Sequence, residues 1–102
     1  MGEMSERASW RAMRDEILNR PGAGAAYEAT RIRFELGETV RLRREALGLT
    51  QAQLAEATGM QQPAVARFEA GGTMPTIMVL ERFADALGMR LTVELEPLEQ
   101  AS

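Results

Sequence analysis

Residues 50–71, TQAQLAEATGMQQPAVARFEAG, place two short helical patterns on either side of one interior glycine, Gly59. The first pattern opens with Thr-x-x-Gln at residues 50–53, which is typical of a capping box at a helix start. The second contains Pro63, which a helix tolerates only in its first turn, so this helix begins within one residue of Gln62. The stretch therefore predicts two helices joined by a glycine turn, with glutamines at the tip of the second.

The second helix is expected to turn polar side chains outward, because Val65 and Phe68 supply its core side. The side chains expected on the outer face are Gln61, Gln62, Ala66 and Arg67. Glutamine can form two hydrogen bonds with the major-groove edge of adenine, and arginine can do the same with guanine. This is the layout of a DNA-reading helix-turn-helix, in which Gln51 and the free N–H groups of both helix starts would hold phosphate.

Helical patterns also flank this pair. A long pattern runs from about residue 25 to residue 47, and its expected inward side chains are Ala29, Ile32, Leu36, Val40 and Leu47. After AGG at residues 70–72, Pro75 is expected in the first turn of another helix. Its expected inward side chains are Leu80, Phe83, Ala84 and Leu87. The chain is therefore predicted to be mainly helical.

Residues 42–88 resemble the Cro and phage-repressor (XRE-type) family of helix-turn-helix regulators. The residues that carry the resemblance are RREALGLTQAQLAEATG at 43–59, then Val65, Glu69, Gly71, Pro75, Leu80 and ALG at 86–88. The resemblance implies a lambda-repressor-like helical bundle of about five helices that dimerises through a C-terminal β-strand. One departure is Pro63, where the family often has a polar residue that reads a base.

The resemblance also implies roles for particular residues. Gln51 would contact phosphate, and Arg44 would form a structural ion pair with Glu69. Together with the outward face, the DNA-binding residues expected are Thr50, Gln51, Gln61, Gln62, Ala66, Arg67, Arg43 and Thr73. Arg43 and Thr73 would brace the DNA backbone on either side of the reading helix.

Composition limits the alternatives. A chain of 102 residues with 45% hydrophobic content can form one small core. It has no cysteine, histidine or lysine, so a nucleophile with its base, or a metal site, is hard to assemble, and we expect no enzyme, cofactor or metal. All 12 basic residues are arginine, which suits phosphate and guanine but also fits codon bias in a GC-rich genome. Although the net charge is −3, residues 40–73 sum to +1, and the acid lies in residues 74–102.

The two ends of the chain predict separate segments. Residues 1–22 are expected to form an amphipathic helical arm, and residues 23–88 the DNA-binding domain. The apolar stripe of the arm is Trp10, Met13, Ile17 and Leu18, which could pack on the core or insert into the groove of a partner protein. No apolar run approaches the length needed to span a membrane, and the N-terminus lacks a signal-peptide pattern, so we expect a cytoplasmic protein.

Residues 89–97, MRLTVELEP, alternate apolar and polar side chains and predict one β-strand, followed by a tail at 98–102. The side chains expected to contact a second copy are Met89, Leu91, Val93 and Leu95. A single strand has no partner in an otherwise helical chain, so it would pair across a homodimer or dock on another protein.

The wider layout resembles the HigA- and HipB-like antitoxins of bacterial toxin-antitoxin pairs. This implies a dimer that represses its own operon at a near-palindromic double-stranded operator and neutralises a cognate toxin by direct binding. The residues that would bind the toxin are Trp10, Met13, Ile17 and Leu18. Two alternatives remain open. One is a plain repressor without a toxin partner, and the other is a protein-interaction inhibitor that uses the helix-turn-helix only as a scaffold.

Overall fold

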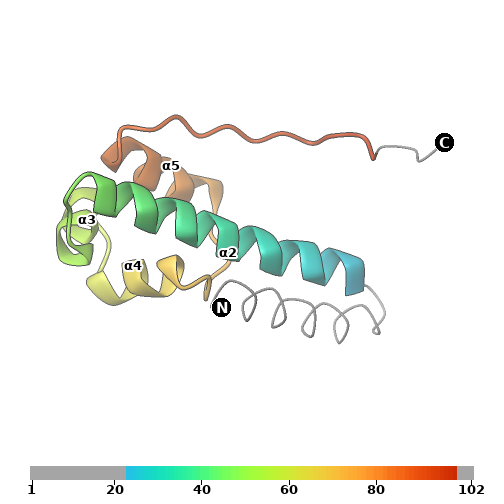
Figure 1. Ribbon diagram of the computed structural model, residues 1–102, viewed down its shortest axis with the longest axis horizontal. Helices are drawn as coiled ribbons and strands as arrows, with labels where there is room; N and C mark the ends of the chain where they lie inside the picture. The colour runs from blue at the N-terminus through green and yellow to red at the C-terminus, as the bar shows by residue number, and fades with distance from the viewer. Residues whose placement is uncertain (1–22, 99–102) are drawn as a thin grey trace, which may run out of the picture.

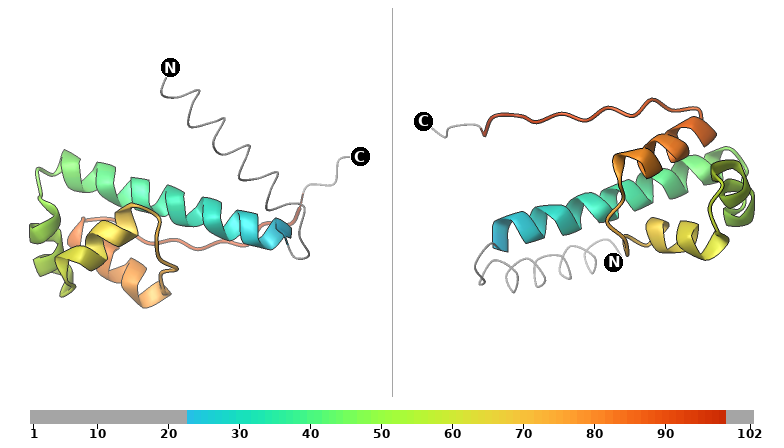
Figure 2. Two further views of the ribbon diagram at one scale, coloured as in Figure 1. Left: turned by 90° about the horizontal axis from the view of Figure 1, so that it is seen from below. Right: turned by 180° about the vertical axis from the view of Figure 1, so that it is seen from behind.

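The structure, a computed structural model, describes residues 23–98 of the 102-residue chain. Within this range the helices are α2 (Ala23–Ala46), α3 (Gln51–Thr58), α4 (Gln62–Glu69) and α5 (Ile77–Ala86). The three shorter helices gather around the C-terminal half of α2, and the N-terminal half of α2 extends beyond them (Figures 1 and 2). The expectation of a mainly helical chain is confirmed.

Local signals fix the start and the end of α3. The Thr50 hydroxyl accepts a hydrogen bond from Gln53 N–H at 3.0 Å, and the Gln53 side chain accepts one from Thr50 N–H at 2.8 Å. The helix ends at Gly59, whose φ of 72° is costly for a residue with a Cβ atom. Two residues later, Gln61 precedes α4 in an extended conformation, and α4 begins at Gln62 with Pro63 in its first turn.

The core lies where α3, α4 and α5 meet the C-terminal half of α2. Phe68 of α4 and Phe83 of α5 contact each other with ring centroids 4.4 Å apart. The other buried apolar residues are Val40, Leu54, Ala55, Val65 and Leu87. Ile32 and Leu47, expected on the inward side of the long helix, are instead exposed. Ile32 lies in the N-terminal half of α2, which extends beyond the other helices (Figure 1).

Gly37 in the middle of α2 allows α4 to pack directly on the α2 backbone. A Cβ atom at this position would lie 2.6 Å from the carbonyl oxygens of both Phe68 and Glu69. The close approach brings the end of α4 against α2, about two turns from the arginines that end α2. A glycine that weakens the helix by its own propensity is therefore needed for the packing of the two helices.

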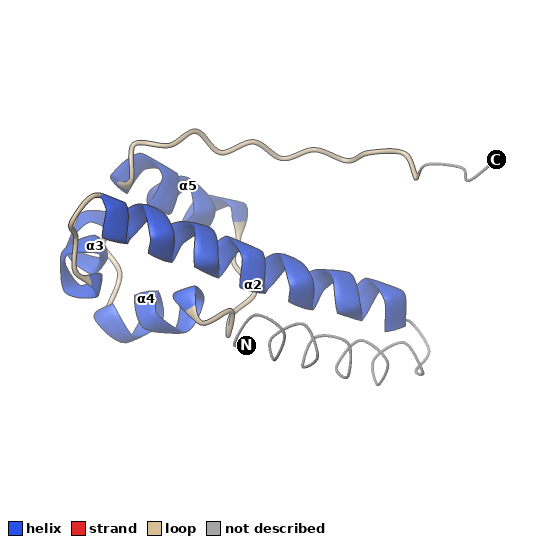
Figure 3. Cartoon of the chain, in the orientation of Figure 1, coloured by secondary structure: helices blue, strands red, loops and turns tan. Residues whose placement is uncertain are grey.

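The predicted C-terminal strand is wrong. After α5 the chain continues as an extended segment, and no residue between 23 and 98 is assigned to a strand (Figure 3). The alternating pattern of residues 89–97 finds no second strand with which to form a ladder in this part of the chain. Only Leu91 is half-buried, whereas Val93 is 64% and Leu95 is 99% exposed.

Four of the about five expected helices lie within the described residues. The fifth would be the N-terminal arm, and residues 1–22 lie outside the described range, as does the tail from residue 99. The boundaries expected for the arm, the domain and the tail stay predictions. None of the helices between residues 23 and 98 is long and apolar enough to cross a membrane.

Candidate nucleic-acid interface

The N-terminal ends of α3 and α4 are joined by a hydrogen bond between two glutamine side chains. Gln62 Nε2 donates to Gln51 Oε1 at 2.8 Å. Gln51 is the first residue of α3 and is half-buried, and Gln62 is the first residue of α4 and is exposed. The turn through Gly59 therefore brings the two helix starts side by side at the surface.

A buried ion pair lies behind this glutamine pair. Arg44, near the end of α2, donates through Nε and Nη2 to the two carboxylate oxygens of Glu69, at 2.7 and 3.0 Å. The two side chains are only 12% and 3% exposed. The third nitrogen, Arg44 Nη1, donates to the Leu49 carbonyl at 2.8 Å. Hydrogen bonding to Glu69 raises the pKa of Arg44 above its ordinary value, so the guanidinium stays charged.

The ion pair and the glutamine pair form one network. Gln51 Nε2 donates to Glu69 Oε1 at 3.0 Å, and the same oxygen accepts from Arg44. This bond requires the amide nitrogen of Gln51 to point inward and its oxygen outward, toward Gln62. Gln62 must in turn present its nitrogen to Gln51. The buried carboxylate of Glu69 thus sets the orientation of an exposed amide on α4.

The remaining residues of the expected reading face also lie on or beside α4. Gln61 and Arg67 are exposed and Ala66 is half-buried. Within residues 23–98 the guanidinium of Arg67 has no hydrogen-bond or ion-pair partner, and its aliphatic stem passes Gly72, where a Cβ atom would lie 3.0 Å from its Cγ. Val65 and Phe68 are buried on the opposite side of the helix. The outer face of α4 is therefore accessible and carries an available positive charge.

Three other residues expected to bind DNA occupy different settings. Thr50 is exposed and caps α3, and Thr73 is half-buried in the loop between α4 and α5. Arg43 Nε donates to the Leu87 carbonyl at 2.9 Å, so its guanidinium interacts with the C-terminal end of α5. The network brings together Gln51 and Gln62 of the expected set, and within residues 23–98 no hydrogen bond joins Arg43 or Thr73 to them.

The residues expected to bind a toxin, Trp10, Met13, Ile17 and Leu18, lie outside the described range.

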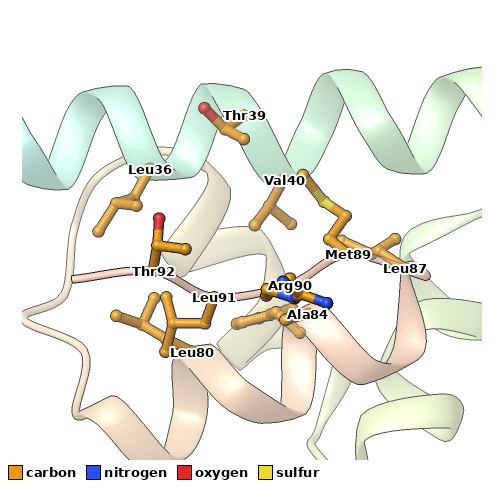
Figure 4. A pocket seen from close by; sticks show the side chains of 11 residues that line it. Leu36, Thr39, Val40, Leu80, Ala84, Leu87, Met89, Arg90, Leu91 and Thr92 are labelled. Carbon is orange, nitrogen blue, oxygen red and sulfur yellow. The ribbon is translucent and has the colours of Figure 1, made fainter.

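The residues expected at a dimer contact lie in the extended C-terminal segment. Its first residues cover a groove of about 240 Å³ between α2 and α5, where Leu36 and Val40 face Leu80 and Leu91 (Figure 4). A role of Met89, Leu91, Val93 and Leu95 in dimerisation stays a prediction.

Sequence reasoning missed the connection of Glu69 to the reading face. The ion pair with Arg44 was expected from the family resemblance, but the bond from Gln51 to Glu69 links residues that are 18 positions apart. No periodic signal marks such a pair, because the contact depends on how α3 and α4 cross. Gly37, which admits the end of α4, is the one sequence feature that points to a close approach of the helices there.

Two helices joined by a glycine turn, the second buried on one side and exposed at its polar tip, define a helix-turn-helix domain. The family model for the helix-turn-helix domain matches residues 35–98, more than half of the chain, and the chain belongs to this family. A curated protein of Haemophilus influenzae (strain ATCC 51907 / DSM 11121 / KW20 / Rd), named an uncharacterized HTH-type transcriptional regulator, is 28% identical over 86 residues. These residues cover 84% of each chain.

The family and the geometry together support DNA binding as the role of the domain and transcription regulation as its context. Membership of this family also supports the expectation that the chain is not an enzyme. Within residues 23–98 no group of three or more His, Cys, Asp and Glu side chains could hold a metal ion.

Proposed function

We propose that this protein is a sequence-specific transcriptional regulator that reads a near-palindromic operator as two copies, with α4 in the major groove. The observation that carries the proposal is the oriented amide of Gln62, held by Gln51 at 2.8 Å. With one N–H engaged by Gln51, the side chain still offers its second N–H and its Oε1. That pair matches the N7 acceptor and the N6 donor of adenine.

Phosphate contacts would hold α4 in register. At the start of α3, Gln53 N–H donates to the Thr50 hydroxyl and Leu54 N–H donates to the Thr50 carbonyl. The N–H groups of Gln51 and Ala52 precede both of these hydrogen bonds. These N–H groups lie at the positive end of the helix dipole, where an anion is stabilised. Arg67 adds an exposed positive charge on α4. Because such contacts release counterions, binding should weaken steeply as salt increases.

The proposal is tested on DNA upstream of the protein's own gene and on duplexes selected from a random pool. Gln62→Ala should reduce the preference for adenine at one position of each half-site by about 5- to 150-fold, which corresponds to about 1–3 kcal/mol for a lost bidentate contact. Arg67→Ala should weaken binding to selected and unselected duplexes, and Arg90→Ala, which removes an exposed arginine from the C-terminal segment, serves as its control. Gel-shift titrations at two salt concentrations measure both effects. Unchanged base preference in Gln62→Ala would reject direct reading by this residue.

The antitoxin role is a second proposal and rests on the sequence resemblance to HigA- and HipB-like proteins. The surfaces of the N-terminal half of α2 and of residues 93–98 are exposed and contain Ile32, Val93, Leu95 and Leu98. They offer apolar area for another protein outside the α3–α4 pair. A toxin gene beside this one is the first thing to seek. If deleting residues 1–22 leaves the chain as able to neutralise that gene product as before, the arm does not bind the toxin.

A further inference from the structure

The start of α5 carries an exposed apolar patch that the DNA-reading role does not use. Met74, Ile77 and Met78 are 63%, 62% and 68% exposed, and all three lie within five residues around the first turn of the helix. Thr76 between them caps α5 by accepting a hydrogen bond from Val79 N–H at 3.1 Å. The patch therefore lies at a helix start whose position is fixed by a cap.

The side chains of α5 divide into a buried or half-buried inner face and an exposed outer face. The inner side chains are Val79, Leu80, Phe83, Ala84, Ala86 and Leu87, which are buried or half-buried, and Leu80 and Ala84 line the groove against α2 (Figure 4). The outer side chains are Ile77, Met78, Glu81, Arg82 and Asp85, all exposed. At 100° per residue these five fall within one arc of about 140°. None of the three charged groups has an ion-pair partner among residues 23–98.

We infer that this outer face of α5, with Met74, is the surface through which two copies of the chain meet on the operator. The inference rests on the proposed reading of a near-palindromic site, because such a site calls for two copies related by a two-fold axis. It is an alternative to a contact through residues 89–97, which form no strand in the structure. The centre of the contact is Met74, Ile77 and Met78, and its edge is Glu81, Arg82 and Asp85.

The charges on the outer face of α5 favour a second copy of the chain over DNA as the molecule that covers it. A two-fold contact brings the same face against itself, so a face of one charge would repel its copy. This face carries Arg82 beside the carboxylates Glu81 and Asp85, so opposite charges are available across the edge of the contact. The excess of carboxylates disfavours DNA phosphate as the occupant. Two methionines at the centre can adapt their shape to each other.

The position of the patch fits the geometry of an operator. Adjacent half-sites lie about 34 Å apart, so each α4 must lie about 17 Å from the two-fold axis. Residues 70–76 join α4 to α5, and seven residues span at most about 25 Å. An axis beside the first turn of α5 therefore lies within reach of an α4 that is docked in its half-site.

The size of the patch predicts a weak contact without DNA. Three exposed side chains contribute on the order of a few hundred Å² per copy, whereas a stable interface needs about 800 Å² from each partner. The free protein should therefore be largely monomeric at micromolar concentration. Two copies should bind the operator cooperatively, because the DNA brings the two patches together.

The chain has no cysteine, so a single introduced thiol can report the contact. Ile77→Cys in the full-length chain should form a disulfide-linked dimer under mild oxidation, with at least fivefold more cross-linking on a selected operator duplex than without DNA. A disulfide requires Cα atoms within about 7 Å, so the bond reports close contact. Val93→Cys, equally exposed at 64%, is the matched control and should cross-link much less. More cross-linking at Val93→Cys than at Ile77→Cys would overturn the inference.

A second pair of variants measures the consequence for DNA binding. Met78→Glu should bind the full operator at least tenfold more weakly, one copy at a time, and should keep its base preference on a single half-site. Val93→Glu should bind like the unsubstituted chain. Sedimentation of protein–DNA mixtures gives the number of copies bound, and circular dichroism verifies folding.

The outcomes separate this inference from the proposed function. If Met78→Glu still binds as two cooperative copies within twofold of the original affinity, the α5 contact is wrong and the reading by α4 stands. If neither the original chain nor the variant prefers any sequence, the proposed function fails. Cross-linking of Ile77→Cys without DNA that equals its own level on the operator duplex would mean a permanent dimer and would overturn the operator-dependent contact.

Discussion

Gln51 Nε2 donates a hydrogen bond to Glu69 Oε1 at 3.0 Å and so joins the first residue of α3 to the last residue of α4. Glu69 is nearly inaccessible and is also paired with Arg44 of α2. One carboxylate therefore connects three helices and fixes the amide that holds Gln62. The orientation of a surface side chain expected to read DNA depends on an ion pair in the interior.

Breaking the interior ion pair should destabilise the fold strongly. Arg44→Ala leaves Glu69 buried without its main partner, and we expect a loss of about 3–5 kcal/mol in the free energy of unfolding. Urea denaturation measures the loss. The control is Arg31→Ala, which removes an exposed arginine paired with Glu28 and Glu35 and should cost less than about 1 kcal/mol. Equal losses in both variants would contradict the structural role of the interior pair.

Gly37→Ala should separate α4 from α2. A methyl group there would lie 2.6 Å from two carbonyl oxygens of α4, and we expect a destabilisation of about 1–3 kcal/mol from overpacking, despite the better helix propensity of alanine. Gly24→Ala in the same helix meets no atom within 4 Å and should be neutral or stabilising by up to about 1 kcal/mol. Thermal unfolding of the two variants checks this difference in sign. A stable Gly37→Ala variant would show that α4 does not pack as described.

Gln51 and Gln62 should act as a unit in DNA binding. In a double-mutant cycle of Gln51→Ala and Gln62→Ala, we expect a coupling free energy of about 1 kcal/mol for binding to a selected operator duplex. The cause is that Gln62 loses its fixed orientation once Gln51 is removed. Fluorescence anisotropy titrations provide the four affinities. A parallel cycle of Gln51→Ala with Arg67→Ala should be additive within about 0.5 kcal/mol, and additivity in both cycles would refute the coupling.

The helix caps should contribute to stability independently of DNA. Thr50→Ala removes the hydroxyl that accepts from Gln53 N–H, and Thr76→Ala removes the one that accepts from Val79 N–H. Each substitution should lower the free energy of unfolding by about 1 kcal/mol. Thr92→Ala, at an exposed position in the C-terminal segment, should change it by less than about 0.5 kcal/mol. Chemical denaturation of all three variants tests the assignment. If Thr50→Ala leaves the free energy of unfolding unchanged, Thr50 does not stabilise α3 as a cap.

The α3–α4 pair could be predicted from sequence because its determinants are local. The capping box at residues 50–53, the left-handed glycine at 59 and the proline at 63 each act within one helical turn. The buried positions of Val65 and Phe68 follow from helical periodicity. These features define which side of α4 is accessible before any tertiary contact is considered.

The C-terminal segment shows where a local pattern fails. Alternation over residues 89–97 is a correct description of the sequence, but a strand exists only when another strand accepts its backbone hydrogen bonds, and none lies within residues 23–98. The start of α5 also differs from the one that the sequence predicts. The sequence places Pro75 in the first turn, whereas Thr76 caps the helix and α5 begins at Ile77. A side chain that caps a helix can outweigh the preference of a nearby proline.

The sequence by itself determined the helices, the cap of α3 and the identity of the amides at the tip of α4, because these depend on residues close together along the chain. Only the tertiary structure decided that Gly37 admits α4 to the α2 backbone, that Glu69 orients Gln51, and that Met74, Ile77 and Met78 stay exposed. Each of these depends on how helices distant in sequence cross. Crossing positions are set by the packing of the whole core and are not encoded in any single segment.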